Sequence, residues 1–170
     1  GSGISDLYGG VSALTVYNGE LIAGGSFATA GGITANHIAR WDGTRWAPLG
    51  SGMDDSVRAL TVYNGELIAG GWFSNVGGVA AKYLARWNGA SWSALAGGTS
   101  ARVLALTVYN GELIVGGYSM KYIVRWNGRV WRRLGGAVNG AVDALTAHRG
   151  ELFAGGTFST VGGVSARGLA

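Results

Sequence analysis

The stretch that decides the fold is ALTVYNGELIAGG, which occupies residues 13–25 and recurs unchanged at residues 59–71. A third copy, at residues 105–117, differs only at Val115. A fourth, at residues 144–156, departs around His148 and Arg149 and has Phe153 in place of Ile. The first three copies begin 46 residues apart and the fourth follows after 39. The chain is therefore an array of repeats, which predicts a structural unit repeated along it.

Each repeat contains two predicted β-hairpins. In the second repeat, two runs of aliphatic and β-branched residues flank Asn64-Gly65. This dipeptide favours a two-residue type I′ turn, because both central residues need positive φ. Asn88-Gly89 is predicted to join the runs at residues 83–87 and 90–94 in the same way. Each repeat therefore predicts four short antiparallel strands, and no window shows the period and caps of a helix.

The first two strands of a repeat are apolar on both faces. In the second repeat, Leu60 and Leu67 fall on one face, whereas Ala59 and Ile68 fall on the other. Sheets stacked face to face around an axis would cover both faces, and four strands in about 40 to 50 residues are typical of a β-propeller blade. We expect an all-β fold, a β-propeller of four-stranded antiparallel blades. About 3.7 blades are predicted, at residues 11–49, 57–95 and 103–134, with an incomplete one at 142–170.

The repeats resemble kelch repeats. Residues 21–25, LIAGG, look like the kelch second strand that ends in Gly-Gly, and residues 40–53, RWDGTRWAPLGSGM, resemble the third and fourth strands. The resemblance extends to a bacterial kelch-like group and to fungal cortical polarity-marker proteins, whose repeats also carry Gly-Gly-x-Phe and Ile-Ala-Arg-Trp. It implies the propeller fold and slightly favours a secreted or cell-surface location, but it implies no ligand. Classical kelch repeats have Tyr where Trp41, Trp87 and Trp126 stand here.

Two alternatives concern how the repeats close into a ring. Residues 1–4 match residues 50–53, and Ala170 matches Ala85 in the third strand of a repeat. An arc of this size is not expected to close alone, because propellers use about four to eight blades. Either two copies form a ring of about eight blades, or the chain is a fragment whose missing blades belong to a longer chain. The near-identity of the repeats indicates recent amplification or engineering.

Composition limits the classes of function. Hydrophobic residues make up 48% of the 170 and charged residues 13%, which favours a packed core. The net charge of +4 is a mild excess, so nucleic acid is not a favoured partner. No apolar run approaches the roughly 20 residues of a membrane helix. The absence of cysteine excludes disulfides and thiolate chemistry.

Loops at one end of the blades are the predicted binding face. The loops between the second and third strands and between repeats are longer and more variable than the Asn-Gly turns at the other end. Trp72 and Tyr118 follow the Gly-Gly doublet where other repeats have Ser26 and Thr157, which suggests exposed aromatic rings for a glycan or protein ligand. The candidate binding residues on this face are Trp72, Tyr118, His37, Asp54, Asp55, Lys82 and Lys121.

Structural alternatives accompany these candidates. The paired tryptophans are expected to pack between blades, the arginines before them to pair with a carboxylate or carbonyl, and Asp54-Asp55 to keep a loop soluble rather than chelate a cation. His37 and His148 are isolated, and no Lys-Ser or Lys-Thr follows the glycines. No catalytic residue, metal site or cofactor is therefore predicted. A basic stretch could contact a polyanion or form a solvated edge: Lys121, Arg125, Arg129, Arg132 and Arg133.

The sequence therefore supports two functions. The first is a non-catalytic propeller that acts as a structural or interaction scaffold and self-associates as a homodimer, with residues 142–156 of one copy packed against residues 11–25 of another. The second is a surface domain that binds carbohydrate or a polyanion through the loop face. An enzymatic role would need an asymmetric set of residues, which near-identical repeats do not supply.

Overall fold

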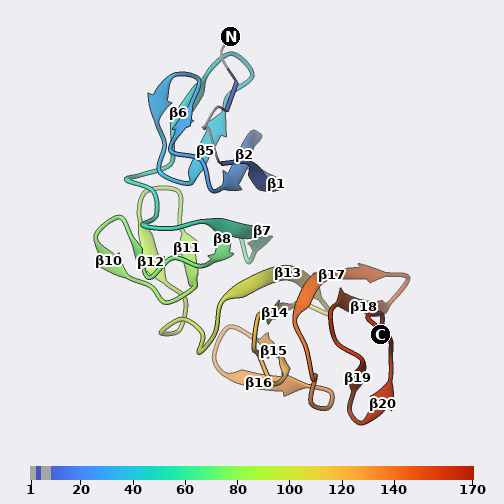
Figure 1. Cartoon of the computed structure of the whole chain (residues 1–170). Helices are drawn as coiled ribbons and strands as arrows, with labels where there is room; N and C mark the ends of the chain where they lie inside the picture. The colour runs from blue at the N-terminus through green and yellow to red at the C-terminus, as the bar shows by residue number, and fades with distance from the viewer. Residues whose placement is uncertain (1–2, 5–8) are drawn as a thin grey trace. The chain divides into compact units, whose positions relative to one another are not determined.

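The computed structural model describes residues 3–4 and 9–170, so the predicted match of Gly1 and Ser2 to residues 50–51 lies outside the described residues. The chain divides into two compact units, Gly1–Thr99 and Ser100–Ala170, which are treated separately below. Every regular element in the described ranges is a β-strand (Figure 1). Accordingly, that part of the chain holds no helix suited to crossing a membrane.

The first unit contains two four-stranded antiparallel blades, each with its strands in chain order. The loop between the second and third strands of each blade carries a small additional hairpin, β3–β4 or β9–β10. The first blade consists of β1 (Val11–Tyr17), β2 (Glu20–Gly25), β5 (Ile38–Trp41) and β6 (Trp46–Pro48), with β3 (Thr29–Ala30) and β4 (Ile33–Thr34) as its hairpin. The second consists of β7 (Val57–Tyr63), β8 (Glu66–Gly71), β11 (Leu84–Trp87) and β12 (Trp92–Ala94), with β9 (Asn75–Val76) and β10 (Val79–Ala80).

The second unit contains the third blade and the described strands of a fourth. The third blade consists of β13 (Val103–Tyr109), β14 (Glu112–Gly117), β15 (Ile123–Trp126) and β16 (Trp131–Leu134). The fourth consists of β17 (Val142–His148) and β18 (Glu151–Gly156), with the hairpin of β19 (Thr160–Val161) and β20 (Val164–Ser165). A third strand starts against β18, since Ala170 N donates to Ala154 O at 3.0 Å. The predicted all-β architecture of repeated four-stranded blades is confirmed.

The two kinds of turn differ, which corrects one expectation. Asn64 and Gly65 both have positive φ, 50° and 77°, as a two-residue type I′ turn requires. In contrast, Asn88-Gly89 begins a four-residue loop between the paired Trp87 and Trp92. Only Gly89 has positive φ there, because the Asn88 side chain accepts hydrogen bonds from the N–H groups of residues 90 and 91, both at 2.9 Å. The identical dipeptides therefore build different turns, and side-chain bonding decides the second.

The second glycine of each Gly-Gly doublet allows the first two strands of a blade to approach closely. A Cβ atom at Gly25 would collide with the carbonyl oxygen of Gly10, and one at Gly71 with that of Ser56. The pairing register shifts at this point in every blade, for example between Val57 and Ala59. This irregularity brings the main chain of the inner strand over the glycine, so a side chain cannot be accommodated.

The first glycine of the doublet is where successive blades stack within each unit. A Cβ atom at Gly24 would lie 2.5 Å from Cγ1 of Val57 and 3.2 Å from Cδ1 of Leu60, both on β7 of the second blade. In the second unit, Gly116 stands in the same relation to Val142 and Leu145 of β17, at 2.6 and 3.3 Å. The valine and leucine of one blade therefore occupy the space that glycine leaves in the blade before it.

Main-chain and tryptophan hydrogen bonds reinforce this stacking. Met53 N donates to Asn36 O at 3.0 Å, and Val138 N donates to Lys121 O at 2.8 Å, each joining one blade to the next. The buried Trp92 donates its indole N–H to Leu49 O at 2.9 Å. The tryptophans also pair within blades, with ring centroids 5.1 to 5.4 Å apart. In the first unit, therefore, the second blade's tryptophan pair packs within its blade and its Trp92 also bonds to the blade before it.

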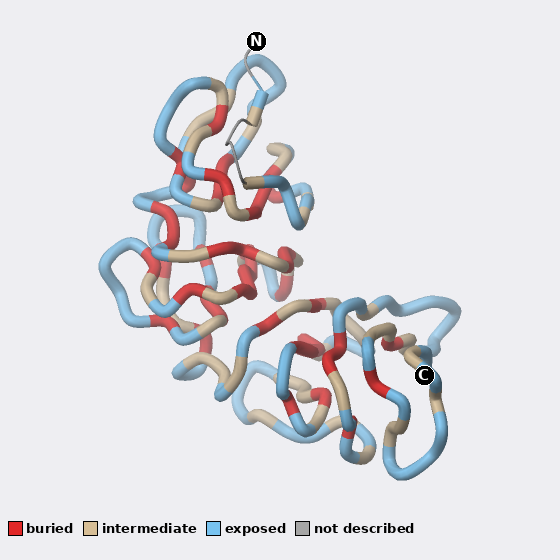
Figure 2. The backbone as a smooth tube through the Cα atoms, in the orientation of Figure 1, coloured by how far each residue is buried: buried red, intermediate tan, exposed pale blue. Residues whose placement is uncertain are grey.

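A buried phenylalanine lies under the loop after each doublet, except in the third blade. Phe27, Phe73 and Phe158 are 0 to 2% exposed. The third blade has Ser119 at this position, and the sulfur of Met120 lies 3.1 Å from the Cβ position of Gly117, as the Phe73 ring does at Gly71. Met120 thus fills the space of the missing ring. Figure 2 shows buried residues along the second strands β2, β8 and β14, whereas β1 and β17 are largely exposed.

Substitution of the first glycine of a doublet tests whether its contact with the next blade, rather than a general cost of replacing glycine in a strand, determines stability. We expect Gly116→Ala to destabilise the fold by about 1 to 3 kcal/mol, because the added methyl group overpacks against Val142. Gly155→Ala is the matched control, since its Cβ would meet nothing nearer than the Ala144 Cβ at 3.7 Å. Urea unfolding measures both variants at a concentration where light scattering shows monomer, so that any effect of Gly155→Ala on assembly does not enter the comparison. Equal losses of stability in the two variants would contradict the stacking account.

Candidate functional site

Asp54, proposed from the sequence as a binding residue, holds the loop of its own blade. Its carboxylate accepts hydrogen bonds from Ser74 N at 2.8 Å, Ser74 Oγ at 2.7 Å and Asn75 N at 2.9 Å. In the fourth blade, Asn139 Oδ1 accepts bonds from Ser159 N and Thr160 N, both at 2.9 Å. Partial burial favours the protonated form of Asp54, but these hydrogen bonds outweigh it and lower the pKa of the carboxyl. Asp54 therefore fixes the loop after β8 through these hydrogen bonds, and this contact is called the Asp54 clamp below.

Asp55 and Trp72 replace a hydroxyl that other blades use. Ser26 Oγ accepts a hydrogen bond from Gly10 N at 3.3 Å, and Thr157 Oγ1 accepts one from Ala141 N at 3.2 Å. Trp72 occupies the hydroxyl position in the second blade, where the Asp55 carboxylate accepts the bond from the following N–H at 2.6 Å. The expectation that Trp72 is exposed is wrong, because its ring is half-buried under the Arg58 guanidinium, 4.5 Å from the ring centroid.

His37 and Lys82 lie beside the third strands of their blades. His37 has a φ of 71°, and its main-chain N–H donates to Phe27 O at 2.8 Å. Its Nδ1 is buried and makes no hydrogen bond among the residues described. Lys82 is exposed, and its carbonyl accepts a bond from Thr99 N at 3.0 Å. In the structure, both residues contribute main-chain contacts to the fold.

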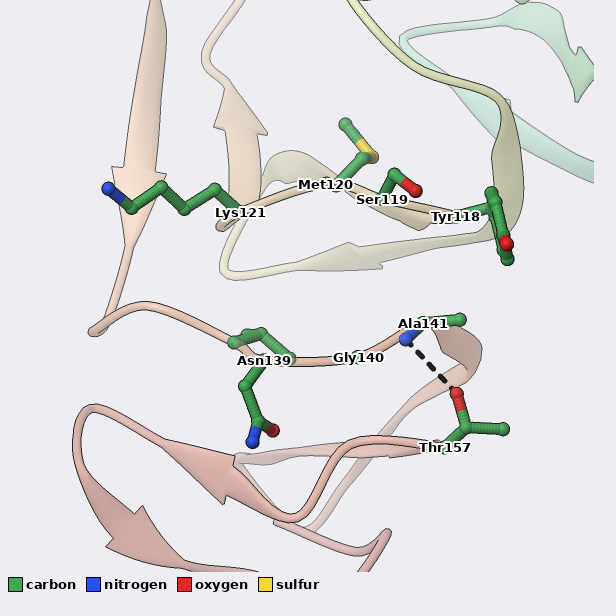
Figure 3. Close-up of a pocket in the computed structure, with 9 residues that line it drawn as sticks. Tyr118, Ser119, Met120, Lys121, Asn139, Gly140, Ala141 and Thr157 are labelled. Atoms are coloured by element: carbon green, nitrogen blue, oxygen red, sulfur yellow. Dashed lines mark hydrogen bonds between the residues drawn. The ribbon is translucent and has the colours of Figure 1, made fainter.

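Tyr118 and Lys121 are the two predicted residues that share a pocket. This pocket, of about 390 Å³, is lined by the short loop between β14 and β15 and by the segment before β17 (Figure 3). The Tyr118 side chain is 58% exposed. Figure 3 places Tyr118 and Lys121 at opposite ends of the loop. The residues that line the pocket are Tyr118, Ser119, Met120, Lys121, Val138, Asn139, Gly140, Ala141 and Thr157.

Positive charge gathers at the Lys121 end of the pocket. The Lys121 Nζ lies 5.7 Å from the centroid of the Tyr122 ring, and the Arg133 guanidinium lies 4.0 Å from the same centroid. The Arg125 guanidinium is matched to Glu112 at 2.9 Å. The second unit contains eight of the 13 Lys and Arg residues but only three of the nine Asp and Glu residues. Of the residues that line the pocket, the charged one is Lys121.

A second hollow, in the first blade, has its charges already paired. Its volume is about 340 Å³, and Arg40, Glu20, Arg45 and Asp42 are among the residues that line it. Arg40 Nη1 lies 3.3 Å from Glu20 Oε2, and Arg45 Nε lies 3.6 Å from Asp42 Oδ2. The Arg–Glu pair recurs in the second and third blades, which confirms the expected carboxylate partner of these arginines. We assign these residues to the sheet rather than to a ligand.

The geometry offers little for catalysis or metal binding. Within residues 3–4 and 9–170, no three His, Cys, Asp or Glu side chains gather where they could hold a metal ion. Sequence reasoning identified Tyr118 and Lys121 but missed Ser119, Asn139 and Thr157. Two signals marked the place, namely the seven residues missing from the third repeat and the serine at its buried phenylalanine position.

The Asp54 clamp predicts a change in the pH dependence of stability. A lowered pKa in the folded state means that the carboxylate stabilises the fold above the unfolded pKa, near 3.8, and that this contribution is lost as the pH falls through the folded pKa. We expect Asp54→Ala to cost about 1 kcal/mol at pH 7. Asp54→Asn should preserve these hydrogen bonds, because Asn139 makes the equivalent ones in the fourth blade. It should also remove the loss of stability at acidic pH that protonation of Asp54 causes. Urea unfolding from pH 3 to 7, recorded for both variants, would contradict this if Asp54→Asn were as damaging as Asp54→Ala.

Comparisons with known proteins agree on the fold. A family model described as the DUF5122 β-propeller, a domain of unknown function, matches residues 18–41 and 64–93. A search of curated proteins finds no match. The chain is similar to the crystal structure of the computationally designed Ika8 protein, with a TM-score of 0.62 and 17% identity over 93% of this chain, and it spans about half (49%) of that protein. The computationally designed Ika4 protein gives a TM-score of 0.60 and 18% identity, over 91% of this chain and 92% of that protein. The chain therefore has a β-propeller fold.

Proposed function

We propose that the chain is a non-enzymatic β-propeller scaffold whose copies assemble through the faces of the first and fourth blades. The observation that carries this proposal is that each face presents one half of a contact already used inside the chain. We also propose that the repeats are kelch-like, which the Gly-Gly end of the second strand and the fourth-strand tryptophans Trp46, Trp92 and Trp131 support, whereas Trp41, Trp87 and Trp126 depart from the classical Tyr.

The first blade presents the projecting half of the contact. Val57 and Leu60 of β7 are 0 and 9% exposed, because they pack on Gly24 of the blade before them. The equivalent residues of β1 are Val11 and Leu14, which are 44 and 59% exposed. Exposed apolar residues whose equivalents in the other blades are buried or partly buried are typical of an interface.

The fourth blade presents the receiving half. Gly155 is equivalent to Gly24 and Gly116, but no valine or leucine lies over it. A Cβ at Gly155 would meet nothing nearer than the Ala144 Cβ at 3.7 Å, whereas one at Gly24 would lie 2.5 Å from Cγ1 of Val57. A second copy could place its Val11 and Leu14 there with the geometry that the chain uses internally.

Such a contact is head-to-tail, because the two faces differ. A head-to-tail contact forms a closed ring when the rotation permits and an open filament when it does not. We propose a homodimeric ring of about eight blades, because one chain carries about 3.7 of them. A second copy is the favoured occupant because one chain carries both complementary halves.

Light scattering after size exclusion, across a dilution series, tests the assembly. We expect the wild-type chain to have twice its mass of 17.4 kDa, and Leu14→Asp and Gly155→Ala each to be monomeric. Val164→Asp, at an apolar residue 70% exposed elsewhere in the fourth blade, is the control that should remain dimeric. Mixing Leu14→Asp with Gly155→Ala should restore a complex, because each variant retains the face that the other lacks.

Three outcomes would count against this proposal. A wild-type chain that is monomeric and folded at every concentration would overturn self-association. Dimers that persist in Gly155→Ala would overturn the assigned faces. Open chains of increasing mass would retain the faces but overturn the closed ring, and would favour additional blades of a longer chain as their natural occupant.

A further inference from the structure

We propose that the pocket beside Tyr118 binds an acidic oligosaccharide, that is, a short chain of pyranose rings carrying carboxylates. The site lies within the second unit and uses none of the residues of the proposed assembly faces. Its function is therefore independent of the assembly, and the two can fail separately.

The pocket exists because the third blade lacks a hairpin. The first, second and fourth blades carry β3–β4, β9–β10 and β19–β20 between their second strand and the third. In the third blade, residues 118–122 make the same connection directly, and β15 follows at Ile123. The hairpin elsewhere pairs with the segment before its blade, as Met53 does with Val76. Shortening the loop removes this cover from the face.

The shortened loop leaves a hollow without a defect in the core below it. Met120 is 7% exposed and fills the space of the phenylalanine, and the bond from Val138 N to Lys121 O keeps the link to the next blade. The floor is therefore packed and hydrogen-bonded like its equivalents. A preformed hollow of about 390 Å³ falls within the range of ligand sites, about 300 to 1,000 Å³.

Tyr118 supplies a surface for a sugar ring. Its side chain is 58% exposed, whereas the ring of Trp72, at the equivalent position, is covered by Arg58. An exposed aromatic ring at the rim of a pocket packs against the C–H groups of a pyranose, and its hydroxyl bonds to the sugar's polar edge. Thr157 Oγ1 accepts the Ala141 N–H bond, which leaves its own proton for a sugar oxygen.

Lys121 and Arg133 supply the attraction for carboxylates. Both cations lie over the Tyr122 ring. Of the acidic residues of this unit, Glu112 is paired with Arg125, and the other two are on β17 and β18. Tyr118 and Lys121 lie at opposite ends of the loop, so a ligand of more than one sugar unit is suited to reach both. The arrangement therefore favours an oligosaccharide, with one ring on Tyr118 and a carboxylate near Lys121.

Calorimetric titration with trigalacturonate, at low salt, tests the proposal, with neutral maltotriose as the matched ligand. We expect saturable binding of trigalacturonate that weakens about tenfold in Tyr118→Ala and in Lys121→Ala, the loss of one favourable contact each. Trp72→Ala, at the equivalent loop position of the second blade, where the ring is covered by Arg58, should leave the affinity unchanged. Added salt should weaken the binding, because an exposed carboxylate and lysine are screened.

A loop graft gives a second, independent test. Replacing residues 118–121 with residues 72–82 of the second blade restores the missing hairpin and should abolish binding while the chain remains folded. Any of three results would overturn the proposal. The wild-type protein could fail to bind trigalacturonate, it could bind maltotriose equally well, or both point variants could bind trigalacturonate as tightly as the wild type. Light scattering on the same samples shows whether assembly is intact, so loss of the ligand site is not confused with loss of the ring.

Discussion

The close approach of main chain and side chain at the Gly-Gly doublet is the constraint on which the structure depends. The second glycine lets the first strand of the blade cross over it, and within each unit the first glycine, Gly24 or Gly116, accepts a valine and a leucine from the following blade. One dipeptide therefore fixes both the bulge inside a blade and the stacking between blades. This explains why the doublet is kept in all four repeats while neighbouring positions vary. On the first blade the equivalent Val11 and Leu14 are exposed, and on the fourth blade no valine or leucine of the described residues lies over Gly155.

Much of the fold could be predicted because its determinants are local. Asn64-Gly65 and the apolar runs beside it specify a hairpin without reference to the rest of the chain. The fate of Asn88-Gly89 could not be predicted in this way, because the same dipeptide builds a longer loop once its side chain accepts two main-chain bonds. Similarly, the burial of Trp72 depends on Arg58, which the repeat pattern does not connect to it.

The candidate site was less predictable, because it is made by a deletion. Tyr118 could be identified as a variable position in a conserved frame of repeats, but Asn139 and Thr157 reach the pocket only through the stacking of the fourth blade on the third. For Asp54 the sequence suggested a binding residue where the structure shows a loop contact. An acidic pair on a loop resembles a ligand site in sequence, yet three hydrogen bonds commit the first carboxylate to its own loop.

The bonds from Met53 N to Asn36 O and from Val138 N to Lys121 O have a consequence for how such a protein diversifies. Both bonds connect main-chain atoms, so they do not depend on which side chains occupy the loop. The bond from Val138 to Lys121 forms even though the third blade lacks the hairpin. The ends of each such loop are therefore fixed by main-chain hydrogen bonds, while the length and sequence between them can change. An array of nearly identical blades can thereby acquire a different surface at every blade while its interior remains uniform.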